Sequence, residues 1–159
     1  MNKFLHYILP AILFALLSLA APQSIQAQDQ AIMVIANDKG AQTSMTMKEL
    51  KSVMLGEKQR WADGTKVSIA FMKANTAVGS ATAKKIMGMT GDQLNKFWLA
   101  LVFQGKAKAP VFYGSSTDVE NYVSQNPGAI GVVEAGYTLK SGHVVNIEGD
   151  SLKSKIKTF

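Results

Sequence analysis

The sequence has 159 residues, a formal net charge of +6 at pH 7 and no cysteine. It is long enough for one compact domain, and the core of that domain cannot depend on disulfide bonds. The mild excess of Lys and Arg suits small anions or an acidic surface as partners, although solubility alone also explains a charge of this size.

The first 27 residues have the pattern of a secretory signal peptide. Lys3 precedes an apolar run over residues 7–21, and Ala27 is a small residue at a plausible cleavage position. We expect cleavage after Ala27, which leaves residues 28–159 as one soluble domain in a Gram-negative periplasm. A membrane anchor is the alternative, but Pro10 interrupts the run, which is shorter than the roughly 20 residues that cross a bilayer. No cysteine follows the run, so a lipoprotein anchor is excluded.

The first predicted elements of the mature chain are a buried strand over residues 31–36 and a turn over residues 37–40. A helix should follow, because Thr46 and Glu49 are spaced as a capping box, in which each side chain satisfies an open backbone donor. Gly56 can end this helix in a left-handed conformation. One face of the helix is apolar and contains Met47, Leu50, Val53 and Met54.

A tight turn at Asp63-Gly64 predicts a hairpin that leads into an alternating strand over residues 66–71. An alanine-rich helix is expected from residue 75 to residue 87, stopped by Gly88.

A second capping box, formed by Thr90 and Gln93, opens the next helix, which should end at Gly105. We assign the broad apolar face of this helix to the core rather than to a cofactor site. The face consists of Leu94, Phe97, Trp98, Leu101 and Val102.

The last third of the chain predicts a loop over residues 106–114 and a short helix that Ser115 or Ser116 begins. The apolar run over residues 129–133 is typical of a strand that is covered on both faces, and residues 144–147 form a final strand candidate. Strands that alternate with helices indicate an α/β sandwich around a central sheet, with no second domain.

Three segments carry a family resemblance: TMKELKSVMLGEKQRWADG at residues 46–64, KFWLALVFQG at residues 96–105 and NPGAIGVVE at residues 126–134. In residue pattern and order they resemble segments of the phosphate-binding proteins and of their short relatives. Phosphate-binding proteins are the solute-binding components of ABC phosphate importers. The resemblance implies one lobe of a type II periplasmic binding protein, in which helices flank a central mixed sheet. Residues 31–36 would correspond to the hinge strand.

A single lobe would hold only half of the ligand cleft of such proteins. They bury an anion between two walls of backbone amides and hydroxyls, whereas a lone wall leaves the anion hydrated. Each hydrogen bond then contributes only about 0.5 to 1.5 kcal/mol, because it competes with water. A homodimer would be one way to supply the second wall.

The resemblance also implies the residues that contact the anion. The family has an Arg-Ser-Asp-Gly-Ser-Gly-Thr loop at a helix start, where this sequence has MKANTAVGS at residues 72–80. Lys73 stands near the arginine position, Asn75 and Thr76 stand at the helix start, and Ser44 is a further candidate. Lysine supplies charge without the bidentate fork of arginine, and the family's glycines are absent here. In the alternative interpretation, Asn75 or Thr76 only caps the helix.

Catalysis finds little support in the sequence, so we expect neither an enzyme nor a cofactor. The serine-nucleophile elbow, the paired-histidine zinc motif and the phosphate-binding P-loop are all absent. His143 is the only histidine after the leader and should be a solvated loop residue. The acid pairs Asp118 with Glu120, and Glu148 with Asp150, have spacings that are ordinary for solvated surface segments.

Two alternative functions remain open. The domain could be an accessory module that keeps the fold without a ligand and docks onto a permease or another envelope protein, with Phe112 and Tyr113 as contact residues. The pairs Met45 with Met47, and Met87 with Met89, could bind cuprous copper, although core packing explains them as well. Nucleic-acid binding is not expected, because Lys153, Lys155 and Lys157 form only a small basic tail.

Overall fold

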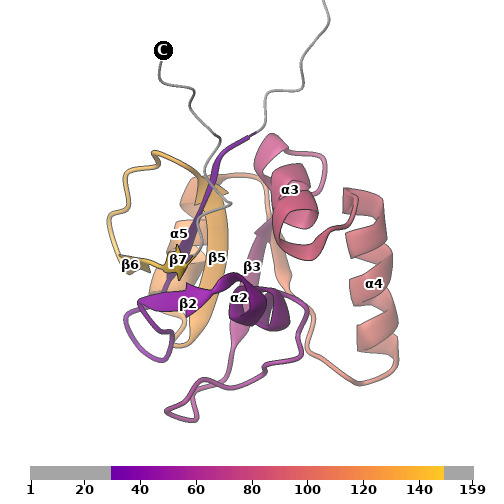
Figure 1. Ribbon diagram of the computed structural model, residues 1–159, viewed down its shortest axis with the longest axis horizontal. Coiled ribbons are helices and arrows are strands. Elements are labelled where there is room, and N and C mark those ends of the chain that lie inside the picture. The colour runs from indigo at the N-terminus through magenta and orange to yellow at the C-terminus, as the bar shows by residue number, and fades with distance from the viewer. Residues whose placement is uncertain (1–29, 149–159) are drawn as a thin grey trace, which may run out of the picture.

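A computed structural model describes residues 30–148 of the chain (Figure 1). The expected signal peptide, Asp150 and the basic tail lie outside these residues. Within residues 30–148, no helix combines the length and the apolar character that a membrane span requires.

The main sheet has five strands in the order β4-β3-β5-β1-β6 and is mixed, as the resemblance implied. β3 (Ser68–Met72) lies parallel to β4 (Val111–Tyr113) and to β5 (Ala129–Glu134). β1 (Ile32–Ala36) runs antiparallel to both β5 and β6 (His143–Val144).

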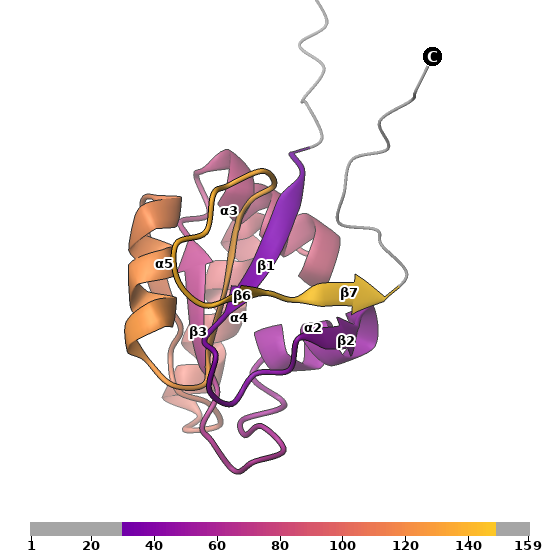
Figure 2. The same ribbon diagram turned by 90° about the vertical axis from the view of Figure 1, so that its left-hand side faces the viewer.

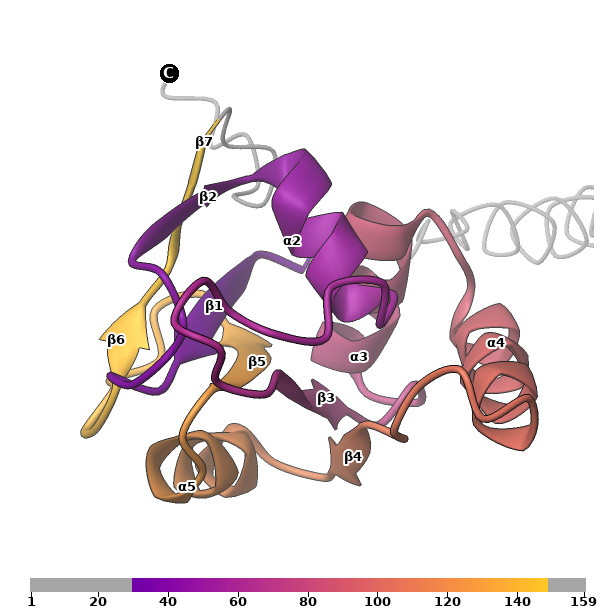
Figure 3. The same cartoon turned by 90° about the horizontal axis from the view of Figure 1, so that it is seen from below.

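Helices cover both faces of this sheet (Figure 3). α5 (Ser116–Gln125) lies on one face. On the other face lie α2 (Met47–Met54) and α3 (Ala77–Thr82), which continues as the π-helix η1 (Ala83–Met87) up to the left-handed Gly88. α4 (Gly91–Phe103) lies beyond the β4 side of the sheet. This is the predicted α/β class with a central sheet between helical layers.

Both predicted capping boxes are confirmed. The Thr46 hydroxyl accepts from the Glu49 amide while the Glu49 carboxylate accepts from the Thr46 amide, and Thr90 pairs with Gln93 in the same way at the start of α4. Leu50, Val53 and Met54 are fully buried, as the helical spacing predicted.

Two burial predictions are wrong. β3 does not alternate, because helices cover it on both faces and residues 69–72 are all buried. The sequence pattern predicts that Val102 lies in the core, but its side chain is 40% exposed. Leu99 and Phe103 on the same helix are exposed as well. Only Leu94 and Trp98 of α4 are fully buried, because this helix lies at the side of the sheet rather than across it.

The predicted last strand is divided between two sheets (Figure 2). β6 pairs with β1, whereas β7 (Asn146–Glu148) pairs in parallel with β2 (Ser44–Thr46). The buried Val145 lies between them and donates its amide to the Val34 carbonyl at 2.9 Å. Sequence periodicity could not show this change of partner.

Two of the segments that carry the family resemblance contact each other. The hairpin after α2 brings the buried Trp61 against the start of β5, where its indole Nε1 donates to the Gly128 carbonyl at 2.9 Å. Gly128 has a φ of 77°, and a Cβ at this position would lie 2.3 Å from the Lys66 carbonyl oxygen. Only glycine fits here, because both the backbone conformation and the space exclude a side chain.

Candidate functional site

A short loop joins the carboxyl end of β3 to α3 and contains the predicted anion ligands Lys73, Asn75 and Thr76. The Lys73 amide donates to the Tyr113 carbonyl at 2.8 Å, so the loop begins at the point where β3 and β4 separate. Lys73 and Asn75 are exposed. Thr76 is the N-cap of α3.

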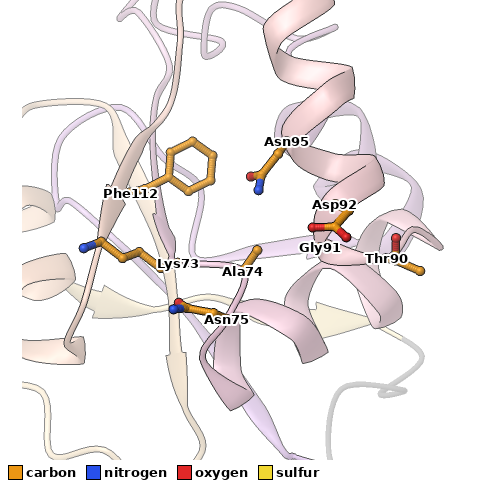
Figure 4. Close-up of a pocket in the computed structure, with 8 residues that line it drawn as sticks. All are labelled: Lys73, Ala74, Asn75, Thr90, Gly91, Asp92, Asn95 and Phe112. Carbon is orange, nitrogen blue, oxygen red and sulfur yellow. The ribbon is translucent and has the colours of Figure 1, made fainter.

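The second wall of the site is the amino-terminal end of α4. This end and the loop after β3 enclose a hollow of about 540 Å³, which we call the carboxyl-edge hollow (Figure 4). The loop and α4 approach closely, since a Cβ on Gly91 would lie 2.7 Å from the Ala74 Cβ. The hollow is lined by Lys73, Ala74, Asn75, Thr90, Gly91, Asp92, Asn95 and Phe112.

The carboxyl-edge hollow contains both signs of charge. Asp92 and Asn95 extend from α4 toward the loop, whereas the Lys73 side chain extends away from α4 (Figure 4). The Thr90 hydroxyl accepts from the Gln93 amide. The amides of Gly91 and Asp92 come before Gln93 in the first turn of the helix and have no acceptor within the helix. The helix dipole and Lys73 favour an anion here, and Asp92 opposes one.

The Thr76 hydroxyl is used inside the protein. It accepts from the Gly79 amide at 3.0 Å and donates to the Lys73 carbonyl at 2.7 Å. The structure thus contains the cap of the alternative interpretation, and Thr76 does not line the hollow. Gly79 allows this close fit, because a Cβ there would lie 2.1 Å from the Lys73 carbonyl oxygen.

Ser44 lies apart from the other predicted ligands. It belongs to β2, where it is paired with Asn146 of β7, and it does not line the carboxyl-edge hollow. The structure therefore brings Lys73 and Asn75 together with the start of α4, which the sequence assigned to no site.

Glu120 was expected to be solvated, but it is 3% exposed. Its carboxylate accepts from the Tyr137 hydroxyl at 2.7 Å and from the amides of Lys140 at 2.5 Å and Ser141 at 2.9 Å. Burial raises the pKa of Glu120, but these hydrogen bonds outweigh burial and hold the pKa below its usual value. Glu120 therefore fastens the loop that follows β5 onto α5.

A second pair of polar side chains lies at the carboxyl end of β5, where the Ser116 hydroxyl donates to the Glu134 carboxylate. Neither Glu120 nor this pair was predicted. The spacing of acids along a helix gives no signal for partners that are about 20 positions away.

His143 is also not the solvated residue that the sequence suggested. It begins β6, where its Nδ1 lies 3.3 Å from Asp38 Oδ1 and its Nε2 lies 3.3 Å from the Gln42 carbonyl oxygen. Among residues 30–148, no group of three or more His, Asp or Glu side chains is placed to hold a metal ion.

The residues proposed for copper and for partner contacts pack against the core. Met45 and Met87 are buried in the core, and Met47 and Met89 are partly buried and pack against the core. The Phe112 ring lies 5.7 Å from the Phe71 ring, and the Tyr113 ring lies 5.8 Å from the Tyr122 ring. Burial raises the pKa of Tyr113.

Comparison with solved structures identifies the fold. The fold is similar to that of the ABC-type phosphate transport receptor from Vibrio cholerae, with a TM-score of 0.59 and 15% sequence identity. The match covers 76% of this chain and 47% of that chain. PstS from Borrelia burgdorferi gives a TM-score of 0.53 and 18% identity, covering 76% of this chain and 48% of that chain. For a phosphate binding protein from Stenotrophomonas maltophilia the TM-score is 0.52 and the identity 11%, covering 77% of this chain and 40% of that one.

The chain thus spans less than half of each of these receptors, and its fold is that of one lobe of a phosphate-transport receptor. This confirms the family resemblance at the level of the fold. Neither models of known protein families nor curated proteins gave a match to the sequence.

Proposed function

We propose that the mature domain is a periplasmic binding protein that holds a small oxyanion such as phosphate in the carboxyl-edge hollow. The observation that carries this proposal is that Lys73 and Asn75, both expected to bind an anion, line one hollow with the open first turn of α4. A helix N-terminus offers amide donors and a partial positive charge to an anion. We assign the domain no catalytic role.

The affinity should be low. One wall leaves the anion in contact with water, and the carboxylate of Asp92 repels it. A dissociation constant of about 1 mM would correspond to about 4.1 kcal/mol of binding free energy, the level that a few solvated hydrogen bonds and one lysine can supply.

Calorimetry and thermal shift with phosphate and sulfate test the proposal on the mature protein. Lys73→Ala should weaken binding about fivefold, whereas Asp92→Asn should strengthen it by a similar factor, because the two changes remove opposite charges. Lys48→Ala is the matched control, because Lys48 is an exposed lysine on α2 outside the hollow. Unchanged affinity in Lys73→Ala, or no response at millimolar anion, would reject the proposed site.

A second candidate function is an accessory module that docks onto an ABC permease or another envelope protein. The exposed Leu99, Val102 and Phe103 on α4 favour it, because three large apolar side chains on one helix face are a typical contact surface. A photo-crosslinking residue placed at position 103 should capture a defined partner in cells, and one placed at position 48 should not. Capture at position 103 without any anion response would favour this function, and size measurement would reveal a homodimer.

A further inference from the structure

A second hollow, of about 240 Å³, lies at the opposite end of β3 from Lys73. One wall is the hairpin that precedes β3, and the other is the loop that follows α4; both are seen from below in Figure 3. We call it the basic hollow. Its lining residues are Gly56, Lys58, Gln59, Arg60, Lys66, Val67, Ser68, Ile69, Trp98, Ala107 and Lys108.

The charge of the basic hollow is of one sign. Lys58, Arg60, Lys66 and Lys108 line it, and none of the described residues that line it is acidic. The nearby Asp63 accepts from the Thr65 amide and hydroxyl, both at 2.9 Å, within its own turn. Four cations around one concavity create a positive potential that attracts and concentrates anions.

Internal contacts fix the walls of the basic hollow. The Lys58 ammonium lies 5.6 Å from the centre of the Trp61 ring, and Arg60 Nη1 donates to the Gly64 carbonyl at 2.8 Å. Gln59 Nε2 donates to the Lys106 carbonyl at 2.7 Å, which ties the hairpin to the loop after α4. Because Lys58 and Arg60 are held before binding, these two side chains lose less entropy when a ligand arrives.

The floor of the hollow is apolar and includes the buried side chains of Ile69 and Trp98. Trp98 is 3% exposed, and its indole Nε1 has no hydrogen-bond partner among residues 30–148. An apolar floor lowers the local dielectric, so charges at its rim interact more strongly than they would in open solvent.

We propose that the basic hollow binds a multiply charged phosphate group, in a site separate from the carboxyl-edge hollow. Four cations, with no acid among the described residues that line the hollow, favour a ligand with several negative charges over a singly charged one. Such a group can belong to a free polyphosphate or to an anionic lipid headgroup. The exposed Phe103 is close in sequence to Lys106 and Lys108, which makes a membrane surface a relevant source.

Pyrophosphate is the probe for the free ligand, and tryptophan fluorescence is the measurement. Trp98 lines the hollow and Trp61 contacts Lys58, so both tryptophans of the chain report on it. We expect a saturable change whose midpoint rises at least about fivefold in Lys66→Ala and in Lys108→Ala. Lys73→Ala and Lys48→Ala should leave the midpoint unchanged. Lys66→Gln keeps a long polar side chain and serves if Lys66→Ala lowers the melting temperature.

The control variants distinguish this site from the proposed function. A pyrophosphate response that depends on Lys73 rather than on Lys66 would overturn the second site and assign the ligand to the carboxyl-edge hollow. An equal loss in Lys48→Ala would overturn it too, because it would show general attraction to a basic protein.

Co-sedimentation with vesicles distinguishes the two sources. Binding to vesicles that contain cardiolipin, a lipid whose headgroup carries two phosphates, but not to phosphatidylcholine vesicles, reduced by both Lys66→Ala and Phe103→Ser, would assign the hollow to a lipid headgroup. A pyrophosphate response without vesicle binding would assign it to a free polyphosphate. If neither pyrophosphate nor anionic vesicles bind in a Lys66-dependent way, the basic hollow is not a phosphate site.

Discussion

The two hollows at the ends of β3 differ in how their charges are arranged. The carboxyl-edge hollow combines Lys73 with Asp92 and two carboxamides, whereas the basic hollow collects four cations and no acid among its described lining residues. The carboxyl-edge hollow occupies the place where the family resemblance implies a ligand. A shared fold therefore indicates where a site can be sought, while the residues present determine how strongly a hollow attracts an anion.

The largest effect on this comparison should come from Gly79→Ala. The added Cβ would lie 2.1 Å from the Lys73 carbonyl oxygen, which is backbone and cannot move without displacing the loop. We expect a loss of about 3 kcal/mol in the free energy of unfolding, the upper part of the range for overpacking. Urea denaturation measures it, and Ser80→Ala on the same helix is the control. Phosphate binding should be lost while pyrophosphate binding remains; loss of both would show that the two hollows are not independent.

A smaller loss of stability is expected for Glu120→Gln. In the wild type, the buried carboxylate accepts from three donors. The neutral amide of the variant has only one acceptor oxygen for them. The cost should be about 2 kcal/mol, and Tyr137→Phe, which removes only one of the donors, should cost about half as much. Equal stability of Glu120→Gln and the wild type in urea would mean that this loop is not fastened through the carboxylate.

Glu120 should also make the free energy of unfolding depend on pH. Because the pKa of Glu120 is lowered in the folded protein, its stabilising contribution is complete above the pKa of the unfolded chain. That contribution is lost as the pH falls through the folded-state pKa. Between about pH 5 and pH 3 the wild type should therefore lose more stability than Glu120→Gln. Parallel loss in both proteins would contradict the role given to this carboxylate.

Salt should weaken anion binding to a different extent in the two hollows. Raising the salt concentration from about 0.05 M to 0.5 M should weaken pyrophosphate binding at least about tenfold, because four cations attract it. Phosphate binding in the carboxyl-edge hollow should weaken by only about threefold, since Asp92 offsets Lys73 there. Fluorescence titration and calorimetry at the two salt concentrations measure both effects. Equal salt dependence would remove the distinction between the hollows.

The smallest effect is expected for Phe103→Ser. Phe103 is 82% exposed, so the folded protein gains little from its ring, and the free energy of unfolding should change by less than about 0.5 kcal/mol. A loss above about 1.5 kcal/mol in urea denaturation would show that the ring packs against the protein, and would remove the basis for a contact surface on α4.

The parts of the fold that depend on local chemistry could be predicted from the sequence. Thr46 with Glu49 and Thr90 with Gln93 form capping boxes through contacts three residues apart, and the apolar run of β5 follows from burial on both faces. The choice of the loop after β3 as a candidate site came from the family resemblance, and Lys73 and Asn75 do line a hollow there.

The parts that depend on distant contacts could not be predicted. The acceptor role of Glu120 toward Tyr137, the presence of Asp92 and Lys73 in one hollow and the division of the last strand all arise from tertiary packing. The same is true of the basic hollow, because Lys58 and Lys108 are 50 positions apart and no local pattern brings them together.

Residue-resolved amide shifts of the isotope-labelled mature protein, measured by NMR during a phosphate titration, test whether phosphate binds in the carboxyl-edge hollow. We predict that phosphate shifts the amides of Lys73, Asn75, Gly91 and Asp92 in a saturable way and that Lys73→Ala reduces these shifts. In a separate titration, pyrophosphate should shift the amides of residues 58–68 and 106–108. If phosphate shifts only the amides around the basic hollow, or none at all, the carboxyl-edge hollow is not the oxyanion site.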